Sequence, residues 1–270
     1  MEETLLRLAR AIDEKHYGKH RGFVVDNEDP QKRARLLLRI PGLLGDQVTD
    51  WALPCLPFGG LADQGFFSVP ENEAQVWVEF EEGDIQRPIW TGTFWQQEGD
   101  APQEAALDVP TTRLFKTPAG HILQFDDEEG AEKFILHHPT EAEMSVDENG
   151  SILLTDAGGA TVTLDASSGE LNIEDANGNS MKMTSSGTTV EDANGNKIEM
   201  AASGITVEGQ QVVVKGSTVM LAGQGGEPII KGQSFLTLFM THMHPHPFGP
   251  TGPPIPQGEM SSLSAKVLTS

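Results

Sequence analysis

The sequence predicts an all-β fold, with a small antiparallel barrel in the first part of the chain and a long array of short strands after it. The 270 residues include 29 Gly and 17 Pro but only 6% aromatic residues. This balance suits short strands joined by turns better than one thick core. From residue 113 onward, turn signals recur at nearly constant spacing, which is typical of a repeat architecture.

Four runs within residues 21–97 predict the strands of the barrel. They read G-F-V-V-D, R-A-R-L-L-L-R-I, Q-V-W-V-E-F and R-P-I-W-T-G-T-F-W, with turn pairs such as Asp-Pro and Gly-Asp between them. In the third run Val76, Val78 and Phe80 share one face, as expected of a half-buried strand. Several short strands in so few residues favour a small antiparallel barrel.

The segments on either side of the barrel differ from it in composition. In the N-terminal segment, 1–20, residues 2–16 predict a short amphipathic helix, whose apolar positions are Leu5, Leu8, Ala9 and Ile12. Because so short a helix is marginal alone, we expect it to pack on a partner subunit or on the next domain. The charges throughout this segment argue against a signal peptide. No run in the sequence reaches the ~20 apolar residues that are needed to span a bilayer. Residues 98–112, rich in Glu and Pro, predict a linker.

The strand array, residues 113–234, is built on a repeat. Its turn glycines lie 8 to 10 residues apart, at Gly150, Gly159, Gly169, Gly178, Gly187, Gly195 and Gly204. The hexapeptide E-D-A-N-G-N occurs twice, at 174–179 and 191–196. Asn-Gly and Gly-Gly pairs suit tight reversals because they accept positive φ. The alternating runs between the turns, which include Q-V-V-V-K and T-V-M-L at the end, predict stacked short strands.

Such an array is not expected to be stable as a single layer. Each strand offers two or three apolar side chains on one face, and burial at roughly 25 cal/mol per Å² does not offset the ordering cost of a lone meander. Several identical chains around one axis would bury that face. We therefore expect an intertwined or prism-like oligomer, most simply a trimer, with a monomeric β-solenoid as the alternative.

Composition also limits the partners and chemistry. The chain has 18 Lys and Arg against 40 Asp and Glu, a net charge of −22. So acidic a protein is not expected to bind nucleic acid directly or to attach to anionic lipid. Cys55 stands alone, so no intrachain disulfide can form. No nucleophile elbow, Walker loop or zinc-protease motif is present, and no catalytic residue is predicted.

The barrel segment also carries motifs that are found together in a known family. Residues 16–97 contain K-H-R-G-F-V-V-D-N-E-D-P, R-L-L-L-R-I-P-G, W-A-L-P-C-L-P-F-G-G and V-W-V-E-F-E-E-G-D followed by R-P-I-W-T-G. They resemble the central spike proteins of contractile-tail baseplates, the baseplate assembly protein V and VgrG-like family. The resemblance implies an OB-fold for 21–97 and a trimeric triple-stranded β-helix, the needle, for 113–234.

The same resemblance implies a function, partners and a location. The chain would be a non-enzymatic homotrimeric spike of the virion tail baseplate, assembled in the host cytoplasm, that pierces the target cell envelope. Its N-terminal helix would contact a separate baseplate hub protein, and a tip-capping protein is a further candidate partner. The muramidase domain of T-even spikes has no counterpart in the short linker here, so cell-wall hydrolysis is not expected.

Three histidines in the C-terminal region, 235–270, recur at every second position in T-H-M-H-P-H-P. On a strand, His242 and His244 would share a face, and three chains would present six imidazoles, which suit octahedral iron better than tetrahedral zinc. The family resemblance implies the same site, a structural iron ion, one per trimer. His246 lies between two prolines and is not expected to be a ligand, nor is the His137-His138 pair. A helix through residue 244, or a metal-free loop, remains an alternative.

Two other functions fit parts of the sequence. A metal-dependent enzyme on a β-solenoid would hold a labile metal with an open coordination position at the histidines. A carbohydrate-binding fibre would display aromatic side chains along the strand array. Residues 135–234 contain no Phe, Tyr or Trp, which weighs against the fibre.

Overall fold

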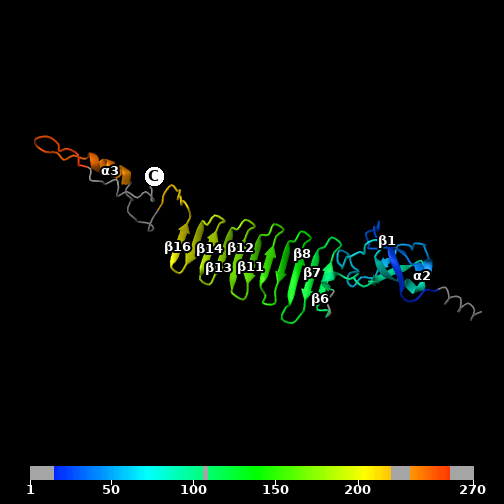
Figure 1. Ribbon diagram of the computed structural model, residues 1–270. Coiled ribbons are helices and arrows are strands. Elements are labelled where there is room, and N and C mark those ends of the chain that lie inside the picture. The colour runs from blue at the N-terminus through cyan, green and yellow to red at the C-terminus, as the bar shows by residue number, and fades with distance from the viewer. Residues whose placement is uncertain (1–14, 106–108, 220–231, 256–270) are drawn as a thin grey trace, which may run out of the picture. The chain divides into compact units, whose positions relative to one another are not determined.

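The computed structural model describes residues 15–105, 109–219 and 232–255 (Figure 1). The predicted helix at 2–16 and the terminal segment after 255 therefore lie almost wholly outside the described residues. The chain has two compact units, 1–207 and 208–270. The first unit is almost entirely β-structure, in one five-stranded and one eleven-stranded sheet, which confirms the predicted fold class.

The five-stranded sheet is the predicted OB-fold. Its strands are β1 (His20–Asp26), β2 (Leu37–Arg39), β3 (Leu53–Pro54), β4 (Gln75–Phe80) and β5 (Pro88–Thr93), in the order β2-β1-β4-β5-β3. All neighbours are antiparallel except β3, which runs parallel to β5. Register shifts in β1 and β4 mark bulges, which bend strands and help the sheet to curl into a half-barrel. Two short helices, α2 (Pro41–Leu44) and η1 (Glu81–Gly83), follow β2 and β4.

The curled sheet encloses the main hydrophobic core of the described residues. The core consists of Val24, Leu36, Leu38, Ile40, Ala52, Val76, Val78, Phe80 and Trp90. The alternation in β4 thus buries the residues that the sequence placed on one face. The indole of Trp90 donates a hydrogen bond to the Ala34 carbonyl at 2.9 Å, so its one polar atom is satisfied. The same bond ties β5 to the segment before β2.

A buried ion pair organises the loop between β1 and β2. The Asp29 carboxylate accepts a hydrogen bond from the Arg35 guanidinium at 2.6 Å and backbone N–H groups from Gln31 and Arg33. The Arg35 guanidinium also lies over the Trp51 ring, 5.5 Å from its centroid. The bond from Arg35, followed by the backbone donors, holds the pKa of Asp29 well below its ordinary value. The loop is therefore built around a carboxylate that must stay charged.

We expect Asp29→Asn to lower the urea midpoint of the OB domain at pH 7. The depressed pKa means that Asp29 stabilises the folded state above its ordinary pKa of ~3.9, and that this contribution is lost as the pH falls toward the folded-state pKa. The midpoint difference between the two proteins should therefore shrink between pH 7 and pH 3. A difference that stays constant over this range would contradict the role given to the carboxylate.

The second sheet is a simple antiparallel ladder in which each strand pairs with its neighbours in sequence (Figure 1). Its eleven strands are β6 (Thr112–Lys116), β7 (Ile122–Asp126), β8 (Lys133–His137), β9 (Glu143–Val146), β10 (Ile152–Thr155), β11 (Thr161–Asp165), β12 (Glu170–Glu174), β13 (Ser180–Thr184), β14 (Gly187–Glu191), β15 (Lys197–Ala201) and β16 (Gly204–Glu208). In the preceding linker, η2 (Gln103–Ala105) contacts β6 through a Glu104–Lys116 ion pair of 2.6 Å.

One type of turn recurs along the ladder and explains the D-x-x-G spacing. The Asp side chain at the first position accepts hydrogen bonds from the backbone N–H groups two and four residues later, at 2.7 to 3.0 Å, in the turns that begin at Asp147, Asp156, Asp175 and Asp192. The glycine three residues after each Asp has positive φ. In one copy, the hydrogen bond from the Asn179 side chain is the main cause that lowers the pKa of Asp175 to about 2.

Gly187 is required for a different reason from these turn glycines. It begins β14 with φ +156°, and a Cβ placed there would lie 2.1 Å from the Met200 carbonyl oxygen of the neighbouring strand. By contrast, a Cβ on Gly195 would meet nothing within 4 Å. We expect Gly187→Ala to lower the melting temperature of the sheet clearly more than Gly195→Ala, whose cost is limited to the ~1–2 kcal/mol of left-handed strain. Equal losses would contradict this close contact.

The described ladder ends at Glu208, before the predicted end of the needle at residue 234. Residues 209–219 contain no strand, so the prediction of one in Q-V-V-V-K, 211–215, is wrong. After Gly204 the next glycines follow at intervals of five and seven residues, so the nine-residue repeat no longer matches a strand and turn. The predicted T-V-M-L strand lies partly outside the described residues. In the second unit, α3 (Gly232–Thr241) is the one helix among the described residues.

Candidate functional site

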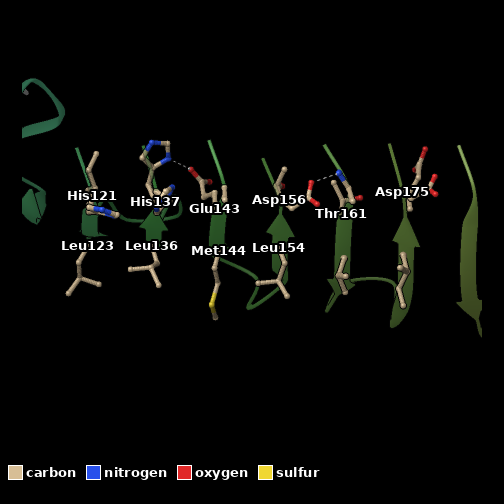
Figure 2. Close-up of a pocket in the computed structure, with 18 of the residues that line it drawn as sticks. His121, Leu123, Leu136, His137, Glu143, Met144, Leu154, Asp156, Thr161 and Asp175 are labelled. Atoms are coloured by element: carbon tan, nitrogen blue, oxygen red, sulfur yellow. Dashed lines mark hydrogen bonds and ion pairs between the residues drawn. The ribbon is translucent and has the colours of Figure 1, made fainter. Parts of the chain in front are cut away.

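One face of the eleven-stranded ladder carries two continuous rows of apolar side chains, defined here as the apolar face. In the first row, successive residues lie directly opposite each other on neighbouring strands: Phe115, Leu123, Leu136, Met144, Leu154, Val162, Ile173, Met181, Val190 and Ile198. The second row lies two residues along each strand, at Phe125, Phe134, Val146, Ile152, Leu164, Leu171, Met183 and Met200, with Arg113 and Thr188 as its polar members. Figure 2 shows Leu123, Leu136, Met144 and Leu154 side by side, pointing the same way.

The opposite face of the ladder is mainly polar. Its central row contains Gln124, Ser145, Thr163, Asn172, Lys182, Thr189 and Glu199, interrupted by Leu114, Ile135 and Leu153. Because side chains alternate along every strand and the register never slips, a period of two in the sequence becomes two chemically distinct surfaces. The ladder is thus an amphipathic sheet.

The apolar face is not covered within the described part of the chain. Leu136 is 51% exposed and Ile173 is 40% exposed, and the described apolar residues that are fully buried belong to the OB domain, apart from Leu236. A groove of about 760 Å³ runs over this face from β6 to β12. Contiguous apolar surface on this scale marks an interaction site. This face is therefore the leading candidate for assembly with other chains.

Three histidines line that groove, His121, His137 and His138. His121 and His138 are opposite each other next to the paired residues Ile122 and His137, and their ring centroids are 4.7 Å apart. The Nδ1 atom of His137 lies 3.5 Å from a Glu143 carboxylate oxygen (Figure 2). From the sequence, the His137-His138 pair is not expected to bind a metal, and no pattern singles out His121. Its proximity to His138 depends on the pairing register, which composition alone does not supply.

The C-terminal histidines follow a helix rather than lie on a strand. The expected strand through His242 and His244 is not formed, because the apolar spacing of Phe235, Leu236 and Phe239 favours α3, which ends one residue before His242. The two imidazoles nevertheless lie close, with ring centroids 5.1 Å apart and planes at 82°.

Hydrogen bonds separate the roles of the three C-terminal histidines. The Nδ1 atom of His242 lies within hydrogen-bond distance of the Phe239 carbonyl oxygen, at 2.5 Å. This contact involves Nδ1 of the ring and not Nε2. The backbone of His244 pairs with Thr251 and closes a loop. Within that loop, His246 Nδ1 accepts a hydrogen bond from the Phe248 backbone N–H at 3.3 Å. No group of three or more potential metal ligands occurs in the described residues, so the predicted six-imidazole site at these histidines would need ligands from other chains.

Comparison with known proteins identifies the first domain. Residues 20–95 match the family described as the type VI secretion system/phage-baseplate injector OB domain. This segment is an injector OB domain. The match confirms, for this segment, the resemblance found in the sequence.

Other comparisons add little beyond the injector OB domain. None of the curated proteins compared matches the chain. Among solved structures, the G-box domain of the microcephaly protein CPAP is similar at 10% sequence identity, over 70% of this chain and 99% of that chain. Its TM-score is 0.27, too low to indicate a shared fold. In the described residues, no helix combines the length and hydropathy that crossing a membrane requires.

Proposed function

We propose that the protein is the homotrimeric central spike of a contractile-tail baseplate, which pierces the target cell envelope and catalyses no reaction. The observation that carries the proposal is an injector OB domain followed along the chain by a ladder with an uncovered apolar face. The ladder would be the piercing needle. Its partners would be two further copies, a baseplate hub protein and, at the tip, a capping protein.

The apolar face supports a trimer in which each chain forms one wall. Since every ladder strand pairs with its own chain neighbours, three sheets meeting by their apolar faces would make a prism rather than an interwoven helix. Two sheets could cover each other but would leave the sides of the contact open. Burying the exposed half of some 15 side chains contributes on the order of 10 kcal/mol per chain before the cost of association.

The ladder is suited to carrying load. Hydrogen bonds in an antiparallel pair run perpendicular to the strands, so in a sequential ladder they follow its long direction. Three such ladders, locked by a common apolar interior, would resist bending when the sheath contracts. The repeated Asp-anchored turns keep each reversal short.

His242 and His244 are the residues that would hold the iron ion. The carbonyl of Phe239 can accept the Nδ1 proton of His242, a partner that fixes the tautomer with Nε2 available to a metal. Two imidazoles per chain would give six per trimer, a donor set suited to octahedral iron. The bound ion would supply a structural clamp, because six protein ligands leave no position for a substrate.

The double variant His242→Ala/His244→Ala is expected to lose the iron completely while the trimer persists. His246→Ala is the matched control and should keep one iron per three chains, because His246 contacts Phe248 instead. Metal analysis of the purified assemblies measures both. Iron retained in the double variant, or lost in the control, would contradict the assignment.

The piercing role is tested in the particle itself. Deleting the gene for this chain from the producing genome should abolish killing or infection, and supplying the wild-type chain in trans should restore it. Particles that remain fully active without the chain would exclude a central spike.

A further inference from the structure

We propose that His121 and His138 form a second metal site, a two-imidazole chelate for a divalent transition metal at the beginning of the ladder. The site is separate from the C-terminal histidines and lies beside the first residues of the apolar face, Leu123 and Leu136. It joins β7 to β8 through side chains where the ladder begins. Imidazole is a ligand type suited to zinc, copper and nickel.

The ring geometry fits a shared ion. The two imidazole centroids are 4.7 Å apart with planes at 73°. A metal bound at ~2.1 Å from a ring nitrogen lies roughly 3 Å from that ring's centroid, so two imidazoles in neighbouring coordination positions have centroids roughly 4–5 Å apart. The observed separation falls within this range.

Hydrogen bonds place both histidines at fixed turn ends. The backbone of His121 receives a bond from Thr117 N–H to its carbonyl at 2.9 Å, and its own N–H donates to the Thr117 hydroxyl at 3.0 Å. In the other turn, His138 Nδ1 accepts a hydrogen bond from the Thr140 backbone N–H at 3.2 Å and lies 2.8 Å from the Thr140 hydroxyl. Because Nδ1 accepts this bond, the neutral ring carries its proton on Nε2, and the ligand atom is Nδ1, where the metal would replace the Thr140 N–H donor.

The surroundings favour a cation. The chain carries a net charge of −22, which raises the local concentration of divalent ions. In the single chain both imidazoles are exposed, so water can complete the coordination sphere. The neighbouring His137 has a different partner, because its Nδ1 lies 3.5 Å from a Glu143 carboxylate oxygen.

The test is a Ni²⁺ and Zn²⁺ titration of the full chain by calorimetry, in a background that removes the three C-terminal histidines and the lone cysteine. The background variant is His242→Ala/His244→Ala/His246→Ala/Cys55→Ser. At pH 7.5 it should bind one ion per chain. In this background, His121→Ala or His138→Ala should weaken metal binding at least tenfold, because only one imidazole of the chelate remains. The control is His137→Ala, next to His138 in the sequence, which should change the metal affinity less than twofold.

Absence of binding at pH 7.5, or an equal loss in His137→Ala, would overturn the proposal. None of these results bears on the trimer or on the C-terminal iron.

Discussion

Ile173→Asp is expected to break the trimer into single chains, while Asn172→Asp leaves it intact. The two positions are adjacent on β12 and receive the same charge change, but their side chains point to opposite faces. In the trimer Ile173 would lie inside the prism, between Val162 and Met181. Three carboxylates would meet there without partners, and burying an unpaired charge costs several kcal/mol per chain.

The control residue has a favourable setting for the new charge. Asn172 is opposite Lys182 on the next strand, so an Asp there gains a cross-strand partner. Light scattering coupled to size exclusion measures both variants against wild type. If Ile173→Asp keeps the wild-type mass, the apolar face is not the trimer interface.

Leu38→Ala is expected to destabilise the OB domain by about 2–5 kcal/mol, since it deletes a fully buried side chain from the core. Leu61→Ala is the matched control, because Leu61 is 75% exposed and its loss should cost little. The four tryptophans, at positions 51, 77, 90 and 95, all lie in this domain, so tryptophan fluorescence reports its unfolding alone.

Urea titration followed by fluorescence therefore measures the effect directly. The Leu38→Ala midpoint should fall well below the wild-type midpoint, and the Leu61→Ala midpoint should stay near it. Similar midpoints for all three proteins would mean that the curled sheet does not enclose the core described for it.

The ladder was predictable because its information is local. Glycine spacing fixes where each hairpin turns, and an Asp five positions before the next strand accepts hydrogen bonds from the backbone N–H groups of the turn. Strict alternation then determines which residues share a face. The strands around Val76 and Trp90 were predictable for the same reason, whereas the parallel pairing of β3 with β5 depends on contacts distant in sequence.

The features that were not predicted depend on contacts or competing preferences that a local sequence pattern does not contain. The pairing of His121 with His138 requires the register of β7 against β8. Near the C-terminus, Phe235, Leu236 and Phe239 suit a helical face, while the alternation of the histidines suits a strand, and the helix prevails up to Thr241. In 211–215, β-branched residues suggest a strand, but no turn at the ladder spacing brings them back to pair.

The mass of the intact assembly tests the central claim most directly. Native mass spectrometry of the purified chain should give a species of three times 29.2 kDa, since three apolar faces are needed to close the prism. A chain that remains a monomer at micromolar concentration would contradict the spike and show that the apolar face is stable in water without a partner.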